Sequence, residues 1–279
     1  MLRGQPSLTA LGAARLRAAH QLLDGGSILA DPLALRILGS GNQTSLDFAQ
    51  SHPAGPRLRW FIAARSRIAE DALNVAASRG ARQLVVLGAG LDTLAYRTPL
   101  AADLRIFEVD HPATQAWKRE MLSTEAIPVP DTLNFVPVDF ERETLEVALR
   151  AAGFDPGLRT FFSWLGVAPY LSEQATFSTL GFVAGLRGGA DIVFDYVNPI
   201  ASLTPAGRVA HRALSERVAG LGESLQTYFE TDRLGEKLRA IGFSHLEDVG
   251  LAELAARFFP PSEQSAPARG GHIMHAATI

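Results

Sequence analysis

Short apolar runs recur along the chain from residue 83 to residue 197 and predict strands, the first of which we expect to be buried on both faces. The first run reads Gln-Leu-Val-Val-Leu and ends in a glycine-rich turn. The predicted strands are Gln83–Leu87, 104–109, 134–138, Thr160–Trp164 and 191–197. Because most of the intervening segments read as helical, we expect right-handed crossovers and a parallel sheet.

The pattern after the fourth run predicts a crossover helix over residues 172–186, followed later by two more strands. Ser172 can cap this helix, and Glu173 lies in its first turn, where the helix dipole is positive. A pair of glycines ends the helix. The two final strands are predicted at 245–249 and 272–276. The fold class we predict is α/β, with a Rossmann-like, seven-strand, mostly parallel sheet that has an antiparallel end.

The first 80 residues predict an all-helical N-terminal cap that belongs to the same domain as the sheet. Alanine-rich and leucine-rich segments there are interrupted by Asp-Gly, Asp-Pro and Gly-Ser-Gly turns. The segment 57–78 carries apolar residues at helical spacing, and Gly80 is a suitable stop signal. This helix leads directly into the first strand.

The rest of the chain, 81–279, is expected to form the core, with one insertion. Residues 198–226, which we call the lid segment, show no strand signal and carry scattered arginine and histidine. We expect them to form a lid that precedes a helix at 232–241.

The composition is that of an ordinary globular protein, with 279 residues, 47% hydrophobic and 20% charged. A formal net charge of −3 offers no positive field to nucleic acid or to an anionic membrane, so a small-molecule or protein substrate fits better. The absence of cysteine excludes disulfides, thiolate zinc sites and a cysteine nucleophile. The chain lacks a secretory signal pattern and a membrane-length apolar stretch, so we expect a cytoplasmic protein.

The turn Gly88, Ala89 and Gly90 follows the first predicted strand. Glycines let a ligand approach the backbone closely, and we expect amide N–H groups here to be free for a polar ligand. The plainer alternative is a tight turn. A dinucleotide-binding turn would carry a third glycine beside a pyrophosphate, but the chain has Thr93 there.

Acidic residues follow the second and third predicted strands. Asp110 can accept hydrogen bonds from ribose hydroxyls, as in sheets that bind NAD or S-adenosyl-L-methionine (SAM). Its alternative role is to cap the helix that begins at Pro112. Asp139 can meet the adenine amino group, and Phe140 can cover the base. In register along successive strand ends, these residues predict an adenosine pocket.

Together these motifs resemble the leucine carboxyl methyltransferase family, especially its bacterial branch of SAM-dependent O-methyltransferases. The quoted segments are Arg65-Ser-Arg, Leu-Gly-Ala-Gly-Leu-Asp-Thr93, Glu-Val-Asp-His-Pro112 and Val-Asp-Phe140, and the resemblance spans about residues 24–196. It implies a class I methyltransferase fold with SAM as cofactor and a SAM-binding core over 81–279.

The resemblance also implies a set of cofactor-binding residues. Arg65 would hold the methionine carboxylate of SAM, and the turn Gly88, Ala89 and Gly90 would face the methionine part. Asp110 would bind ribose, and the adenine contacts would be Asp139 and Phe140. One departure stands out: where family members carry a glutamate after the fourth strand, this chain has Leu165, which offers no charge to the methionine ammonium.

The function we predict is SAM-dependent methyl transfer to a carboxylate or hydroxyl oxygen of a small-molecule acceptor. A carboxylate acceptor needs no base, whereas a phenol or alcohol would benefit from one. Tyr170 and His211 are the acceptor-side candidates, with a pocket-wall role for Tyr170 and a solvated His211 as the plainer readings. The other histidines lack carboxylate-rich spacing, so we predict no metal. The alternatives are an NAD-dependent oxidoreductase and a catalytically silent SAM-binding module.

Overall fold

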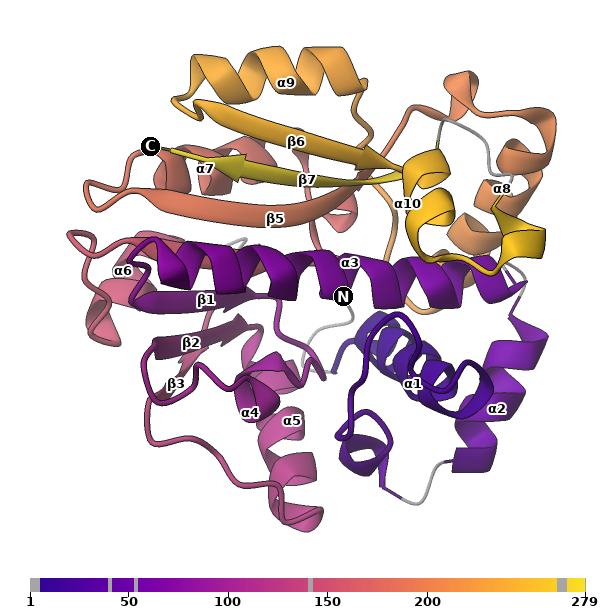
Figure 1. The fold of residues 1–279 in the computed structure, drawn as a ribbon, viewed down its shortest axis with the longest axis horizontal. Coiled ribbons are helices and arrows are strands. Elements are labelled where there is room, and N and C mark those ends of the chain that lie inside the picture. The colour runs from indigo at the N-terminus through magenta and orange to yellow at the C-terminus, as the bar shows by residue number, and fades with distance from the viewer. Residues whose placement is uncertain (1–5, 40–41, 53–54, 140–142, 265–269, 279) are drawn as a thin grey trace.

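A seven-stranded sheet forms the centre of the structure, a computed structural model that describes residues 6–39, 42–52, 55–139, 143–264 and 270–278. The strands are β1 (Gln83–Leu87), β2 (Arg105–Asp110), β3 (Leu133–Pro137), β4 (Thr160–Trp164), β5 (Ala190–Val197), β6 (His245–Gly250) and β7 (Gly271–Ala277). Their order in the sheet is β3-β2-β1-β4-β5-β7-β6 (Figure 1). Strands β1 to β5 are parallel, whereas β7 pairs antiparallel with β5 and β6. The predicted fold class is confirmed, and every predicted strand end lies within one residue of the observed end.

Helices cover both faces of this sheet. They are α1 (Leu8–Leu23), α2 (Asn42–Ser51), α3 (Gly55–Ser78), α4 (Leu94–Arg97), α5 (Pro112–Thr124), α6 (Leu145–Ala151), α7 (Glu173–Ala184), α8 (Pro205–Gly220), α9 (Thr231–Ala240) and α10 (Leu251–Phe258), with short 3-10 turns η1 (Arg36–Leu38), η2 (Ala168–Tyr170), η3 (Ile200–Ser202) and η4 (Pro261–Glu263). Helix α3 crosses one face of the sheet (Figure 1). Side chains such as Val86 and Phe161 belong to the apolar cluster on that face, together with residues of α3 and α10. Their neighbours in the strands, such as Phe107 and Phe162, pack on the opposite face under α6, α7 and α9.

The helix predictions were correct in type and less accurate at the ends. Ser172 caps α7 as predicted, because its Oγ accepts a hydrogen bond of 3.2 Å from the Ala175 amide. The helix ends at Ala184, with Gly185 as its C-cap, before the glycine pair that we expected to stop it. Helix α8 lies inside the lid segment, and α10 was not predicted. In the part of the chain that the structure describes, no helix combines the length and the apolar character needed to cross a membrane.

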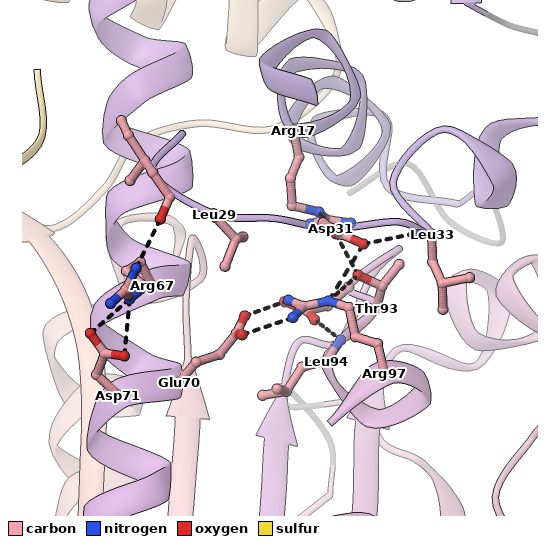
Figure 2. A network of polar contacts seen from close by, with 12 residues as sticks. Arg17, Leu29, Asp31, Leu33, Arg67, Glu70, Asp71, Thr93, Leu94 and Arg97 are labelled. Atoms are coloured by element: carbon pink, nitrogen blue, oxygen red, sulfur yellow. Dashed lines mark hydrogen bonds and ion pairs between the residues drawn. The ribbon is translucent and has the colours of Figure 1, made fainter. Parts of the chain in front are cut away.

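A buried polar network attaches the helical cap to the loop that follows β1 (Figure 2). Its centre is Asp31, whose side chain is fully shielded from solvent. One carboxylate oxygen of Asp31 accepts hydrogen bonds from Arg17 Nε at 3.0 Å and from Thr93 Oγ1 at 2.6 Å. The other oxygen accepts the Leu33 amide at 3.1 Å and lies 3.4 Å from Arg97 Nε.

The two arginines of this network extend it in opposite directions. Arg17 donates from Nη2 to the carbonyl of Leu91 at 2.6 Å, within the loop itself. Arg97 forms a two-pronged pair with Glu70 of α3 (Figure 2). Helix α1, the β1 loop and α3 are therefore joined through charges that water does not reach freely, and such charges are costly to leave unpaired.

We expect Asp31→Asn to lower the free energy of unfolding by about 3–5 kcal/mol, because it leaves two buried arginines without their shared anion. Urea unfolding measures this loss. The control is Asp71→Asn, which removes a pair with Arg67 whose side chains are 56% and 46% exposed. Surface pairs of this kind contribute about 0.5 kcal/mol or less, so equal losses in the two variants would contradict the prediction.

Candidate active site

The carboxyl ends of the parallel strands bring most of the predicted site residues to one edge of the sheet. Gly88 follows β1, Asp110 ends β2 and Asp139 comes soon after β3. The Val138 amide donates to the Asp110 carbonyl at 2.8 Å, which places Asp139 beside the end of β2. Phe140, the other predicted adenine contact, lies outside the described residues.

The glycine turn after β1 is tightly enclosed. Gly88 and Gly90 both have positive φ angles, +64° and +44°. A Cβ at Gly88 would lie 2.3 Å from Val167 Cγ2, and a Cβ at Gly90 would lie 2.9 Å from the Cβ of Ala10 in α1. Only glycine fits these two positions, for reasons of both backbone conformation and space.

The amide groups of this turn do not behave as predicted. We expected them to be free for a ligand, but Gly88 N and Ala89 N donate to the Val109 carbonyl at 2.8 and 3.1 Å. Gly90 N donates to the Asp110 carboxylate at 2.5 Å. The turn folds back across the end of β2, so its backbone is held by the protein, and the expectation of free amides is wrong.

Asp110 is buried at the centre of this edge, with 7% of its surface exposed. One oxygen accepts from Gly90 N, and the other accepts from His111 N at 2.7 Å. The alternative that Asp110 caps α5 is wrong, because His111 is the capping residue and its side chain accepts from Ala113 N. Burial raises the pKa of Asp110, against the opposing effect of the two amide hydrogen bonds. Each carboxylate oxygen keeps a second lone pair that can accept from a hydroxyl.

Glu108, the neighbouring acid on β2, has a different role. It is buried and pairs with Lys118 Nζ at 2.7 Å, while its second oxygen accepts from the Tyr96 hydroxyl at 2.7 Å. Burial raises the pKa of Glu108, and the Lys118 charge acts against this. Both oxygens are thus engaged inside the protein, which leaves Asp110 as the acid available at the strand end.

Arg65 reaches the same edge from α3. Its Nη1 donates to Asp195 of β5 at 2.9 Å, and the second oxygen of Asp195 accepts the Gly166 amide at 2.5 Å. Gly166 has φ of +72°, and a Cβ there would lie 2.7 Å from Arg65 Nη2. The Nε atom of Arg65 is buried and makes no hydrogen bond to the described protein atoms. A buried N–H without a partner is unusual and can indicate a site for a ligand acceptor.

The acceptor-side candidates differ in their surroundings. Burial raises the pKa of Tyr170 to about 12, although the charge of Arg65 opposes the shift, so Tyr170 is a neutral phenol near pH 7. His211 was expected to be solvated, and this is wrong: it is buried in the lid segment, with Nδ1 3.2 Å from Ser215 Oγ. Its burial lowers the pKa of His211, which keeps the ring neutral. Leu165 is partly buried against the apolar cluster under α3.

One further contact, which the sequence did not reveal, joins the lid segment to the N-terminal end of α1. Glu223 accepts hydrogen bonds from Ser7 Oγ at 2.9 Å and Thr9 Oγ1 at 2.6 Å. A few residues later, Gln226 N donates to the Pro169 carbonyl at 2.8 Å. The lid segment is therefore fixed both to the cap and to η2, next to Tyr170.

The prediction of no metal remains a prediction. Among the described residues, His245, Glu247 and His275 place potential ligand atoms within 4.8 Å of one another on strands β6 and β7. Near these atoms, Arg257 lies 4.0 Å from Glu247, and Asp191, which contacts His275, already pairs with Arg159 at 2.7 Å. These arginines compete with a cation for the carboxylates.

A family model, sequence relatives and a solved structure each match this chain to methyltransferases. The leucine carboxyl methyltransferase family model matches residues 10–184. YktD of Bacillus subtilis, named as an inferred SAM-dependent methyltransferase, is 30% identical over an alignment that covers 91% of this chain and 92% of YktD. A Frankia alni protein of the same inferred class is 31% identical over an alignment that covers 89% of this chain and 93% of that protein. The crystal structure of an inferred methyltransferase from Thermobifida fusca covers 99% of this chain and 96% of its own, with a TM-score of 0.61 at 17% identity, and shows the same fold.

We expect Gly88→Ala to destabilise the protein more than Gly80→Ala does. Gly80 also has positive φ, +96°, but a Cβ there would meet nothing within 4 Å, so this control measures the backbone cost alone. The contact with Val167 adds an overpacking cost of about 1–3 kcal/mol. Urea unfolding of both variants gives the difference, and adding Val167→Ala to Gly88→Ala is expected to recover part of it. Equal losses for the two glycines would show that Val167 does not limit the turn.

Proposed function

Because the chain belongs to the leucine carboxyl methyltransferase family, we propose that it transfers a methyl group to a carboxylate or hydroxyl oxygen of a small-molecule acceptor. The coarser activity, SAM-dependent methyl transfer, is that of its family and relatives, and the resemblance expected from the motifs is confirmed. One observation carries the proposal. The glycine turn, the buried Asp110 and Arg65, whose Nε is buried and unpaired, lie together at one edge of the sheet.

The residues at this edge fit SAM in its chemistry. Arg65 has a donor to offer a carboxylate, and guanidinium groups pair well with carboxylates. Asp110 has lone pairs for ribose hydroxyls, and the turn Gly88, Ala89 and Gly90 would lie against the methionine part. Asp139 would contact adenine, and Phe140, outside the described residues, is proposed for the same role. SAM, when bound, supplies a methyl group activated by the positive sulfur.

The protein's own contribution to such a reaction is positioning. Holding two reacting groups in line can supply much of the rate enhancement when the leaving group is already activated. The contacts of Glu223 with Ser7 and Thr9 hold the lid segment against α1, which supports a role in excluding water. Tyr170 can donate a hydrogen bond to an acceptor oxygen, but its raised pKa makes it a poor base. This favours acceptors that are already ionised, such as carboxylates.

The NAD-dependent alternative is less well supported. Thr93, at the place of the third glycine of a dinucleotide turn, is fully buried and donates its hydroxyl to Asp31. The helix that follows, α4, has only four residues and offers a weak dipole to a pyrophosphate. Only Leu165 supports the other alternative, a catalytically silent SAM-binding module. Such a module would bind SAM without methylating any acceptor.

Isothermal titration calorimetry with SAM, S-adenosylhomocysteine and NAD tests the cofactor assignment. We expect micromolar binding of the first two, weakened about 10- to 100-fold in Asp110→Asn and Arg65→Lys, because each change removes hydrogen bonds to charged groups. Asp131→Asn, an exposed site before β3, is the matched control and should bind normally. Preferential binding of NAD, or full affinity in both variants, would contradict the assignment.

Transfer of a labelled methyl group to a panel of small carboxylic acids and phenols tests the chemistry. Since the pKa of Tyr170 is raised to about 12, Tyr170 stays protonated up to about pH 10 and should not titrate in this range. We expect Tyr170→Phe to lower the rate by about tenfold or less and to leave the shape of the pH profile unchanged. A rise near pH 10 in the original protein that vanishes in the variant would identify Tyr170 as a base instead.

A further inference from the structure

Leu165 stands where family members carry a glutamate, so the question is which group of this protein pairs with the ammonium group of SAM. The amino-acid part of SAM carries a carboxylate and an ammonium group side by side. An ammonium group that leaves water needs an anion or several acceptors near it, because burying an unpaired charge is costly. Leu165 provides neither, since it packs among apolar side chains.

A carboxylate stands one strand away from Leu165. Strands β4 and β5 are paired with Trp164 opposite Phe194, so the next positions along, Leu165 and Asp195, are neighbours across the two strands. The hydrogen bond of 2.5 Å from Gly166 N to Asp195 confirms this proximity. The Asp195 carboxylate therefore lies against the backbone segment that carries Leu165.

Asp195 has the burial and the capacity that an ammonium site requires. Its side chain is 7% exposed. A carboxylate can accept about four hydrogen bonds, and among the described residues Asp195 accepts one from Arg65 Nη1 and one from Gly166 N. Beside it, Arg65 keeps a buried Nε without a protein partner. A fixed cation next to a fixed anion matches the paired charges of an α-amino acid.

We propose that Asp195 binds the α-ammonium group of SAM, so that Arg65 and Asp195 together form a clamp for the methionine part. The proposal rests on the proposed function. In this arrangement the carboxylate comes from position 195 on β5, next to position 165, which directly follows β4. The opposite possibility is that Asp195 only neutralises Arg65 and contacts no ligand.

Ligands that lack one charged group separate these possibilities. The first measurement is calorimetry of the unaltered protein with S-adenosylhomocysteine, with its analogue lacking the α-ammonium group, and with 5′-methylthioadenosine, which lacks the whole amino-acid part. We expect the deaminated analogue to bind about 10- to 100-fold more weakly than S-adenosylhomocysteine. Equal affinities would overturn the proposal without the use of any variant.

Asp195→Asn then assigns the effect to one residue. We expect it to weaken S-adenosylhomocysteine about 10- to 100-fold while changing the affinity for the deaminated analogue and for 5′-methylthioadenosine by less than about threefold. The control is Asp191→Asn, four residues earlier on β5, whose carboxylate pairs with Arg159 and should not affect binding. An equal loss for all three ligands would mean a structural role only and would overturn the proposal.

A double variant covers the case in which Asp195→Asn folds poorly. Leu165→Glu combined with Asp195→Asn returns the carboxylate to the neighbouring strand and is expected to restore affinity for S-adenosylhomocysteine to within about tenfold of the original. Failure of this rescue in a folded double variant would count against the clamp. If the unaltered protein binds the deaminated analogue as tightly as S-adenosylhomocysteine, and both more tightly than 5′-methylthioadenosine, only this inference fails; if it binds none of the three, the proposed function fails as well.

Discussion

The Asp31 carboxylate holds the helical cap and the first loop of the sheet in one arrangement. It is fully shielded from solvent, and its partners come from α1, from the β1 loop and from α4. The glycine turn depends on this arrangement, because Gly90 packs directly against Ala10 of α1. The cap is thus part of what shapes the edge that we propose for the cofactor, since moving α1 would release both the turn and the arginines that stabilise it.

The acids at this edge divide into two groups according to their partners. Asp31 and Glu108 have cationic and hydroxyl partners on both oxygens, so they stabilise the scaffold. Asp110 and Asp195 are also buried, but much of their bonding is to backbone amides, Gly90 N and Gly166 N, at the ends of strands. Asp195 also pairs with Arg65 at 2.9 Å, but one amide bond and one ion pair leave part of its accepting capacity unused. Both acids therefore keep lone pairs for hydroxyl or ammonium groups of a ligand.

The sequence predicted β1, β2, β4 and β5 well because these strands are buried on both faces and read as nearly continuous apolar runs, which helices with one polar face do not imitate. Asp110 could be placed for the same reason, since it ends such a run. The Asp31 network could not, because Asp31 and Thr93 are 62 residues apart and charged residues in turns usually face solvent. Asp195 did leave a signal that the pattern reading missed: a charged residue inside the apolar strand β5.

The loop after β1 also bears on the choice between the two cofactors that share an acidic strand end. Burial alone would raise the pKa of Asp92, but the charges of Arg17, Lys118 and Arg97 and the Leu94 amide lower it, so Asp92 is ionised next to the turn. A pyrophosphate placed here would bring negative charge beside Asp92 and Asp110, with Thr93 committed to Asp31 and only a four-residue helix behind it. Three cations, Arg17, Lys118 and Arg97, act on the charge of Asp92, so the acids alone do not select the cofactor. The hydrogen bond that commits Thr93 to Asp31 and the shortness of α4 are what disfavour a dinucleotide at this turn.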